Sequence, residues 1–357
     1  MCMKKKFLMV VCMAMMFTAL FCGCSKEEPV EEKQEETKET EDVVLVIETP
    51  EEEEPVVYVN PITGETSETE MVARPLVVSY DNVGGAIPQS WTSVADIVYE
   101  FPVEGNQTRL QAVFYSEFPE FFGPIRSTRP YFIDLTREYK AIFLAHGWSP
   151  EAKQYLDRGL IPYINAMNSD CKFYRVKDKS APHNSYIKWS EVENKIKEEG
   201  WWDEKREIQP FTFLEEGEES KGKPVVYMEF DSASHCEFTY DAEKNYYVRT
   251  INNGKEYIDK ETGEPLTVKN VLVQKVSSKV LDSKGRLKID MCAGGDAILF
   301  TNGMRVKGTW SRDDLDSRTI FKDNDGNEFK FGVGNTWVMV TDQNTKISYD
   351  VIEEETE

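Results

Sequence analysis

The chain has 357 residues, with 64 Asp or Glu against 42 Lys or Arg, and its formal net charge is −22. Most of that charge lies towards the ends, because residues 25–70 carry −14 and residues 350–357 carry −5, whereas residues 1–24 carry +3. The central part is therefore only mildly acidic, at −6, and its charge disfavours nucleic acid as a partner.

Residues 1–24 are typical of a lipoprotein signal peptide. Three lysines at positions 4–6 precede an apolar run from Phe7 to Phe21, which is shorter than the roughly 20 residues that span a membrane. The run ends in Cys22-Gly23-Cys24, which is similar to a bacterial lipobox. This predicts a lipid on Cys24 that holds the protein at the outer face of the cytoplasmic membrane. An uncleaved anchor or a plain secretory signal is the alternative.

Two acidic segments are predicted outside the folded part. Residues 25–70 contain 17 acidic and 3 basic residues, with almost no aromatic side chains. Such a segment buries too little apolar surface to offset its ordering entropy, so it is predicted to be a disordered, extended tether. Residues 342–357 are predicted to form an acidic tail.

A mixed α/β domain is predicted for residues 71–210, because strand and helix patterns alternate there. Pro130 and the Ser149-Pro150 pair are typical helix starts, and Ser190 with Glu193 has the spacing of a capping box. The predicted strands are Arg74–Tyr80, Ala95–Val103 and Leu110–Tyr115, and the predicted helices begin at Pro130, at Ser149-Pro150 and at Ser190, the last ending at Gly200.

A smaller, mostly β domain is predicted for residues 223–341, after a polar, Gly- and Glu-rich boundary. Short apolar runs alternate there with Asn-Gly and Asp-Gly turn signals, which favours a small sandwich or barrel. The fold class is therefore predicted to be α+β. The strands are predicted at Val225–Phe230, Tyr246–Ile251, Asn270–Val276, Leu287–Met291, Ala297–Thr301, Thr319–Phe321 and Thr336–Val340.

The segment from Gly123 to Pro130 places two arginines in a loop that leads into a predicted helix. Arg126 and Arg129 would sit near the helix N-terminus, where free backbone donors and the helix dipole already favour an anion. Their guanidinium groups would strengthen that preference. The alternative is structural: the arginines would pair with local carboxylates such as Asp96, Glu100 or Asp134.

Other polar residues bracket the predicted elements of the first domain, where sites are usually built. The sequence leaves open whether they converge. The predicted ligand-binding residues are Arg109, Arg126, Arg129, His183 and Asn184, and the candidate catalytic residues are His183, Asp81 and Glu104.

Several common chemistries do not fit the sequence. On one strand, Glu100 and Glu104 would lie about 13 Å apart, farther than the roughly 5–9.5 Å between the carboxylates of glycosidases. The three histidines share no short metal-ligand spacing, so no metal site is predicted, and no cofactor is predicted either. Ser149 lacks the second glycine of a nucleophile elbow and is better explained as a helix cap.

From Arg74 to about Val340 the chain resembles the YerB family of bacterial lipoproteins, which contain DUF3048 domains. This resemblance implies a lipid-anchored extracytoplasmic protein in two parts and implies no activity. The stretches that carry it are Ala95–Glu100, Gly123–Phe132, Ser149–Ala152, Ala181–Asn184, Asp259–Gly263, Asn270-Val271 and Gly308–Trp310.

The leading hypothesis is a lipid-anchored envelope protein that binds an anionic or polar ligand, or a partner protein, around Arg109, Arg126, Arg129 and His183. It depends on the arginine loop and on the lack of a complete catalytic pattern. The alternative is a cell-envelope hydrolase or transferase that uses His183 with a carboxylate. A purely structural assembly factor is a third hypothesis, and it predicts a large exposed apolar patch.

Overall fold

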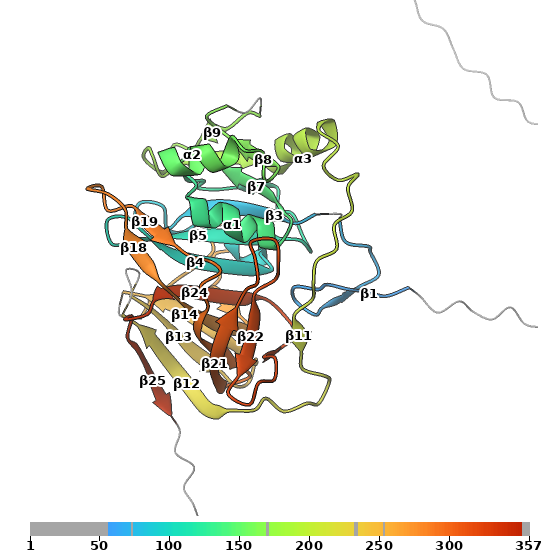
Figure 1. Ribbon diagram of the computed structural model, residues 1–357, viewed down its shortest axis with the longest axis vertical. Coiled ribbons are helices and arrows are strands. Elements are labelled where there is room, and N and C mark those ends of the chain that lie inside the picture. The colour runs from blue at the N-terminus through green and yellow to red at the C-terminus, as the bar shows by residue number, and fades with distance from the viewer. Residues whose placement is uncertain (1–55, 73, 169–170, 232–234, 253, 352–357) are drawn as a thin grey trace, which may run out of the picture. The chain divides into compact units, whose positions relative to one another are not determined.

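The computed structural model describes residues 56–72, 74–168, 171–231, 235–252 and 254–351. Within these ranges strands predominate, with three α-helices and one 3-10 helix (Figure 1). The predicted signal peptide with Cys24, residues 25–55 of the predicted tether and residues 352–357 of the predicted tail lie outside the described residues.

The helices are α1 (Pro130–Glu138), α2 (Pro150–Leu156), α3 (Trp189–Glu198) and the 3-10 helix η1 (Thr92–Val94). The strands up to β11 are β1 (Tyr58–Val59), β2 (Thr66–Ser67), β3 (Leu76–Asp81), β4 (Ile97–Val103), β5 (Gln107–Phe114), β6 (Phe121–Phe122), β7 (Ile142–Ala145), β8 (Tyr163–Asn165), β9 (Tyr174–Arg175), β10 (Ser185–Lys188) and β11 (Thr212–Phe213). The later strands are β12 (Lys223–Phe230), β13 (Cys236–Asp241), β14 (Tyr246–Ile251), β15 (Lys255–Glu256), β16 (Thr267–Val268), β17 (Asn270–Val276), β18 (Ser278–Val280), β19 (Leu287–Ile289), β20 (Gly295–Thr301), β21 (Met304–Ser311), β22 (Ile320–Asp323), β23 (Lys330–Phe331), β24 (Thr336–Asp342) and β25 (Ile347–Val351).

One 16-stranded sheet runs through the described chain, in the order β15-β14-β13-β12-β21-β20-β17-β24-β4-β5-β3-β7-β8, with β16, β22 and β25 attached beside this path. Most neighbours are antiparallel, but β17–β24, β24–β4, β3–β7 and β7–β8 are parallel. Residues 71–210 and 223–341 thus contribute strands to the same sheet, and their division into two domains stays a prediction. The prediction of an α/β first part is confirmed only in part, since its central strands β3, β4 and β5 are antiparallel.

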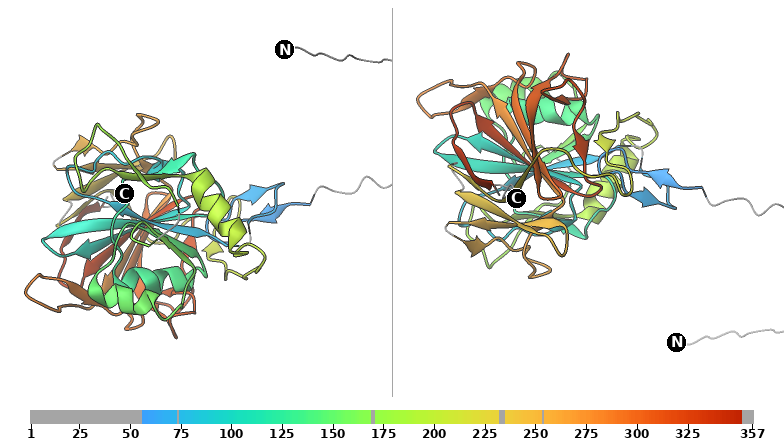
Figure 2. Two further views of the ribbon diagram at one scale, coloured as in Figure 1. Left: turned by 90° about the horizontal axis from the view of Figure 1, so that it is seen from above. Right: turned by 90° about the horizontal axis from the view of Figure 1, so that it is seen from below.

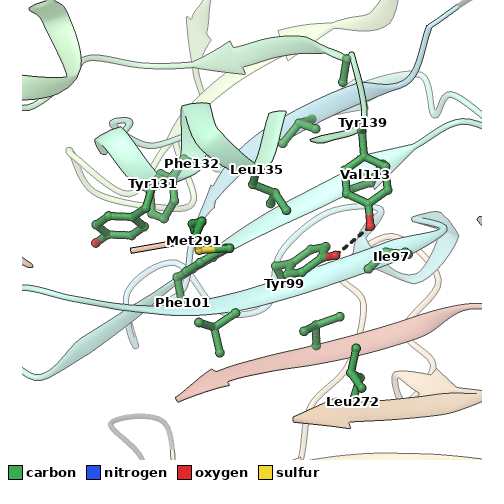
Figure 3. Packing of buried hydrophobic residues seen from close by; sticks show 14 of the residues in the cluster. Ile97, Tyr99, Phe101, Val113, Tyr131, Phe132, Leu135, Tyr139, Leu272 and Met291 are labelled. Carbon is green, nitrogen blue, oxygen red and sulfur yellow. Dashed lines mark hydrogen bonds between the residues drawn. The ribbon is translucent and has the colours of Figure 1, made fainter. Parts of the chain in front are cut away.

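The two faces of β3, β4 and β5 bury different apolar clusters, because side chains alternate along a strand. Tyr99 and Phe101 of β4 pack with α1 residues such as Phe132 and Leu135 (Figure 3), and the Tyr99 and Tyr139 hydroxyls lie 2.7 Å apart. The opposite face packs against α3 and against strands of the second region, including β12 to β14. Figure 2 shows α1 and α3 lying on different sides of the cyan strands. Residues on this second face can therefore contact residues of β14.

The parallel ladder between β4 and β24 is short. It pairs Ile97 to Glu100 with Thr336 to Met339, and it begins with the Thr336 amide donating to the Asp96 carbonyl at 3.1 Å. In a parallel ladder every second residue of a strand donates its amide to the same neighbour, so the next β4 amide that would donate to β24 after Glu100 belongs to residue 102. Pro102 has no amide hydrogen, so the pairing ends there. We refer to this β4–β24 pairing as the seam, because it joins the two predicted regions.

The helix starts at Pro130 and Pro150 are confirmed, and the Ser149 hydroxyl accepts a hydrogen bond from the Ala152 amide at 3.2 Å. The predicted capping box of the third helix is wrong. Helix α3 begins one residue earlier, at Trp189, after Lys188, whose side chain makes no capping bond. The Trp189 amide instead donates to the Glu120 carbonyl at 2.7 Å, because this helix follows directly on strand β10.

Both predicted acidic segments extend too far into the chain. Strands β1 and β2 lie within the predicted tether, residues 25–70, and the turn between them buries Asn60 and Ile62. The Asn60 amide donates to the Asp96 carboxylate at 2.8 Å. Strand β25 lies within the predicted tail, residues 342–357, and pairs with β12. The acidic composition of these segments did not indicate the strands, because a few buried apolar or amide side chains are enough to hold a short strand against the fold.

Candidate functional site

Asp81 ends strand β3 and holds the centre of the site. Its side chain is 2% exposed, and its Oδ2 atom lies 2.7 Å from His183 Nδ1 and 3.1 Å from Arg126 Nε. The strand register also places Asp81 opposite Arg109 of β5. A buried carboxylate needs such partners, because burial without them strongly disfavours its charge. Two of the predicted ligand-binding residues therefore meet at one predicted catalytic residue.

The arginine loop reaches Asp81 through backbone pairing with β3. The Arg126 amide donates to the Ser79 carbonyl at 2.8 Å, and the Asp81 amide donates to the Pro124 carbonyl at 2.9 Å. On the other side, the His146 amide donates to the Arg126 carbonyl at 3.0 Å. The backbone of Arg126 is thus fixed from two directions. Its side chain stays 23% exposed, so part of the guanidinium is open to solvent.

His183 comes from a turn just before β10, and its amide donates to the Ser180 carbonyl at 2.9 Å. Gly85 lies against its ring, since a Cβ atom on Gly85 would be 3.1 Å from His183 Cδ2. The ring is 26% exposed and uses Nδ1 for Asp81. A residue with a Cβ atom at position 85 would require the ring to shift by a few tenths of an ångström.

Arg109 is buried, and its Nη1 atom donates to the Ser127 carbonyl at 2.7 Å. Burial and the positive charges of Arg129 and Arg126 lower the pKa of Arg109 to about 10. Arg109 is therefore close enough to Arg126 and to Arg129 for their positive charges to repel its own. Through its hydrogen bond to the Ser127 carbonyl, Arg109 fixes the backbone of the arginine loop next to Arg126.

Arg129 pairs with Glu104 of the β4–β5 turn. Its Nε atom donates to Glu104 Oε2 at 3.1 Å, its Nη2 atom contacts Glu104 Oε1, and its Nη1 atom donates to the Thr128 carbonyl. Burial would raise the pKa of Glu104, but the hydrogen bonds and charge of Arg129 together bring that pKa below its usual value. Within the described residues Glu104 has no contact with His183, and the carboxylate that His183 meets is Asp81.

Asn184 lies next to His183 in sequence, but its side chain is turned into the local fold. Its amide nitrogen donates to the Val176 and Lys179 carbonyls at 3.0 Å each, and its oxygen accepts from Arg175 at 2.7 Å. These bonds saturate most of the amide and close the turn that carries His183. The geometry thus gives Asn184 a supporting position.

The three carboxylates named as structural partners for Arg126 and Arg129 lie elsewhere. Asp96 accepts from the Tyr115 and Ser116 amides, and Glu100 binds Arg249. Burial raises the pKa of Asp134 to about 6, although the positive charge of Arg312 opposes this shift. Glu104 and Asp81 are the carboxylates that pair with the loop arginines.

A second polar group, which the sequence prediction missed, lies under the same end of β3. Glu100 Oε2 accepts from Arg249 Nη2 at 2.8 Å and from Trp337 Nε1 at 3.2 Å, and both charged side chains are fully buried. Glu100 Oε1 accepts from Thr108 and Asn82. One signal in the sequence could have found Arg249. It lies two residues from Tyr247 and two from Ile251 in a predicted strand, so all three side chains share the buried face.

The described residues contain no group of three or more His, Cys, Asp or Glu side chains arranged to hold a metal ion. None of the helices in the described ranges has the length and apolar character that crossing a membrane requires.

Two family descriptions match the chain. The DUF3048 N-terminal domain, described as a protein of unknown function, matches residues 62–202, and the DUF3048 C-terminal domain, described in the same way, matches residues 226–338. The Bacillus subtilis (strain 168) protein named "Putative lipoprotein YerB" is 34% identical over 286 residues, covering 78% of this chain and 85% of the relative. A crystal structure of the YerB protein from Bacillus subtilis is similar with a TM-score of 0.72 and 31% identity, over 82% of this chain and 99% of that chain.

Proposed function

Because this chain belongs to the DUF3048 family, in which a relative carries a lipoprotein name, we propose that it is a lipid-anchored extracytoplasmic binding protein. The lipid would be on Cys24, and the folded part would stand outside the cytoplasmic membrane. Its site would take an anionic or polar group at Arg126 and His183.

One observation carries this proposal: the buried Asp81 carboxylate holds two partly exposed donors side by side. Arg126 and His183 both contact Asp81 Oδ2, while about a quarter of each side chain remains exposed. Such a carboxylate orients the two groups in advance, so less side-chain entropy is lost when a ligand binds. The Nη1 and Nη2 hydrogens of Arg126 can then bind a carboxylate or phosphate oxygen.

The other predicted residues support this arrangement from behind. Arg109 and Arg129 are buried against backbone carbonyls, and Arg129 also binds Glu104. Their charges add to the positive potential at Arg126, because burial weakens solvent screening. Asn184 closes the turn that presents His183. We therefore assign ligand contact to Arg126 and His183, and positioning to Arg109, Arg129 and Asn184.

Replacing Arg126 by alanine is expected to weaken anion binding about tenfold or more, since a hydrogen bond to a charged group contributes about 1.5–3 kcal/mol. The measurement is isothermal titration of the full-length protein in detergent. The probes are inorganic phosphate, acetate and wall fragments released by muramidase.

Arg137→Ala is the matched control, because Arg137 is comparably exposed, at 18%, and is paired with Asp316 at 2.6 Å. This variant should bind like the unmodified protein. Equal binding by Arg126→Ala and the unmodified protein would remove Arg126 from the site. Binding of none of the three probes by the unmodified protein would overturn the proposed function.

A second candidate function is hydrolysis or group transfer in the cell envelope. The 2.7 Å contact between Asp81 Oδ2 and His183 Nδ1 favours it, because such a carboxylate orients the ring and leaves Nε2 as the available base. Of the three candidate catalytic residues, His183 and Asp81 would then act together, whereas Glu104 is paired with Arg129.

This second function predicts that the full-length protein converts muramidase-released wall fragments to new products, and that His183→Asn reduces the rate by about a hundredfold or more. Product formation would be followed by mass spectrometry. His235→Asn is the control, because His235 lies in the second region. Fragments that bind but stay unchanged over long incubation would leave the binding function and exclude hydrolysis of these fragments.

A further inference from the structure

A cavity of about 230 Å³ lies beside the buried Arg249 side chain, which pairs with Glu100. It opens where the end of β3, the start of β5 and the end of β14 meet. Asp81, Arg126 and His183 are not among its lining residues. The polar side chains that line it are Asn82, Asn106, Gln107, Thr108, Arg249, Asn252 and Tyr257.

Arg249 supplies unmatched donors at this cavity. The residue is fully buried, its Nη2 atom donates to Glu100, and its guanidinium lies 4.0 Å from the Tyr257 ring centroid and 4.6 Å from that of Trp337. Its Nε and Nη1 atoms have no hydrogen-bond partner in the part of the chain that the structure describes. A buried donor left in this state costs about 1–3 kcal/mol. An acceptor oxygen held in the cavity would remove that cost.

The charge of Arg249 is already balanced, which argues against an anion here. Glu100 is equally buried and lies 2.8 Å away, so the pair is neutral as a unit. Glu100 does not line the cavity, but its charge beside Arg249 would repel an anion there, and the anion would also lose its own hydration. A neutral oxygen acceptor satisfies the free donors without adding a buried charge.

The rim of the cavity offers carboxamide groups. Asn106, Gln107 and Asn252 are exposed, and none of the three has a side-chain hydrogen bond to another described residue. Each carboxamide presents donors and an acceptor together. Neighbouring hydroxyl groups on a sugar ring present the same combination, so amides and hydroxyls can bond in both directions. A ligand with only carbonyl groups, or only amines, would use the donors or the acceptors of these carboxamides but not both.

We propose that this cavity binds a neutral, hydroxyl-rich ligand of about one sugar ring, such as a hexose or an N-acetylhexosamine unit. The volume of 230 Å³ is below the roughly 300–1,000 Å³ of sites for drug-sized molecules, which fits one ring and not an oligomer. Gln107 and Asn252 bind hydroxyl groups at the rim, and the free donors of Arg249 bind an oxygen at the floor. The first DUF3048 region supplies Gln107, and the second supplies Arg249 and Asn252.

The test is saturation-transfer NMR on the full-length protein in detergent, with the methyl glycosides of glucose and of N-acetylglucosamine as probes. At least one glycoside is expected to bind. Gln107→Ala and Asn252→Ala are each expected to weaken that binding about three- to tenfold, as loss of one neutral hydrogen bond predicts. Arg126→Ala should leave it unchanged, which separates this cavity from the Asp81 site.

Asn245→Ala is the matched control. Asn245 has a φ of 54° and Asn252 a φ of 51°, so alanine meets the same left-handed backbone at both positions, and Asn245 does not line the cavity. Saturation transfer to neither glycoside would overturn the proposal. So would glycoside binding that survives in a Gln107→Ala/Asn252→Ala double variant. Displacement of the bound glycoside by inorganic phosphate in the Arg126→Ala variant would also overturn it, because it would identify an anion site.

Discussion

Removing either Glu100 or Arg249 is expected to lower the free energy of unfolding by about 3–5 kcal/mol. Both side chains are fully buried, so Glu100→Ala leaves the Arg249 cation without its counter-charge, and Arg249→Ala leaves the carboxylate in the same position. The loss of Glu100 also removes the acceptor used by Trp337. The measurement is urea unfolding of each variant, followed by tryptophan fluorescence.

Replacing both charges together should cost much less than the two single changes combined. In a Glu100→Leu/Arg249→Met variant neither member of this pair carries a charge, and the methionine still packs between Tyr257 and Trp337. A double variant as unstable as the sum of the singles would show that the two side chains act independently. Single variants that lose less than about 1 kcal/mol would show that the pair is not desolvated as its burial indicates.

Replacing Phe101 by alanine is the second large expected effect, at about 3–5 kcal/mol of unfolding free energy. Phe101 is fully buried in β4, and its ring centroid lies 5.4 Å from that of Phe132 and 5.6 Å from that of Tyr131 in α1 (Figure 3). Alanine would leave a cavity between the sheet and the helix. Urea unfolding with circular dichroism measures the loss.

Phe101→Leu is the control for this position, because it keeps most of the apolar volume and should cost less than half as much. Similar losses for leucine and alanine would mean that ring geometry, and not volume, holds α1 on the sheet. A loss below about 1 kcal/mol for alanine would show that the sheet and α1 close the cavity by moving together.

Local sequence patterns predicted the helices whose start is marked by a proline or a capping residue. Pro130 and Ser149-Pro150 mark helix starts, and the structure begins helices there. Strand β21 was missed because Gly308 and Lys307 interrupt its apolar pattern. Gly308 is required by a close neighbour, since a Cβ atom there would lie 1.8 Å from the Lys322 carbonyl oxygen of β22. Such a contact is a property of the assembled sheet and leaves no pattern within one strand.

The sequence could identify residues of the candidate site, but it could not show that they lie together in space. Arg126 and His183 stood out because loop arginines and a histidine at a turn are common binding groups. Their meeting at Asp81 depends on the loop pairing with β3 and on the turn before β10, neither of which a local pattern specifies. Arg249 was missed because an arginine in a strand is normally placed on the solvent side, and its partner Glu100 lies 149 residues away in sequence.

The seam has a consequence for how the chain can fold as it is made. Trp337 reaches Glu100 across 237 residues of sequence, and strand β24 supplies the second neighbour of β4. A chain that is made from its N-terminus therefore has β4 available for pairing long before β24 arrives. During that interval one edge of β4 is unpaired, and such an edge can pair with another chain. Contacts this distant in sequence also form slowly. The first region can therefore complete its strand pairing only after the last part of the chain has been made.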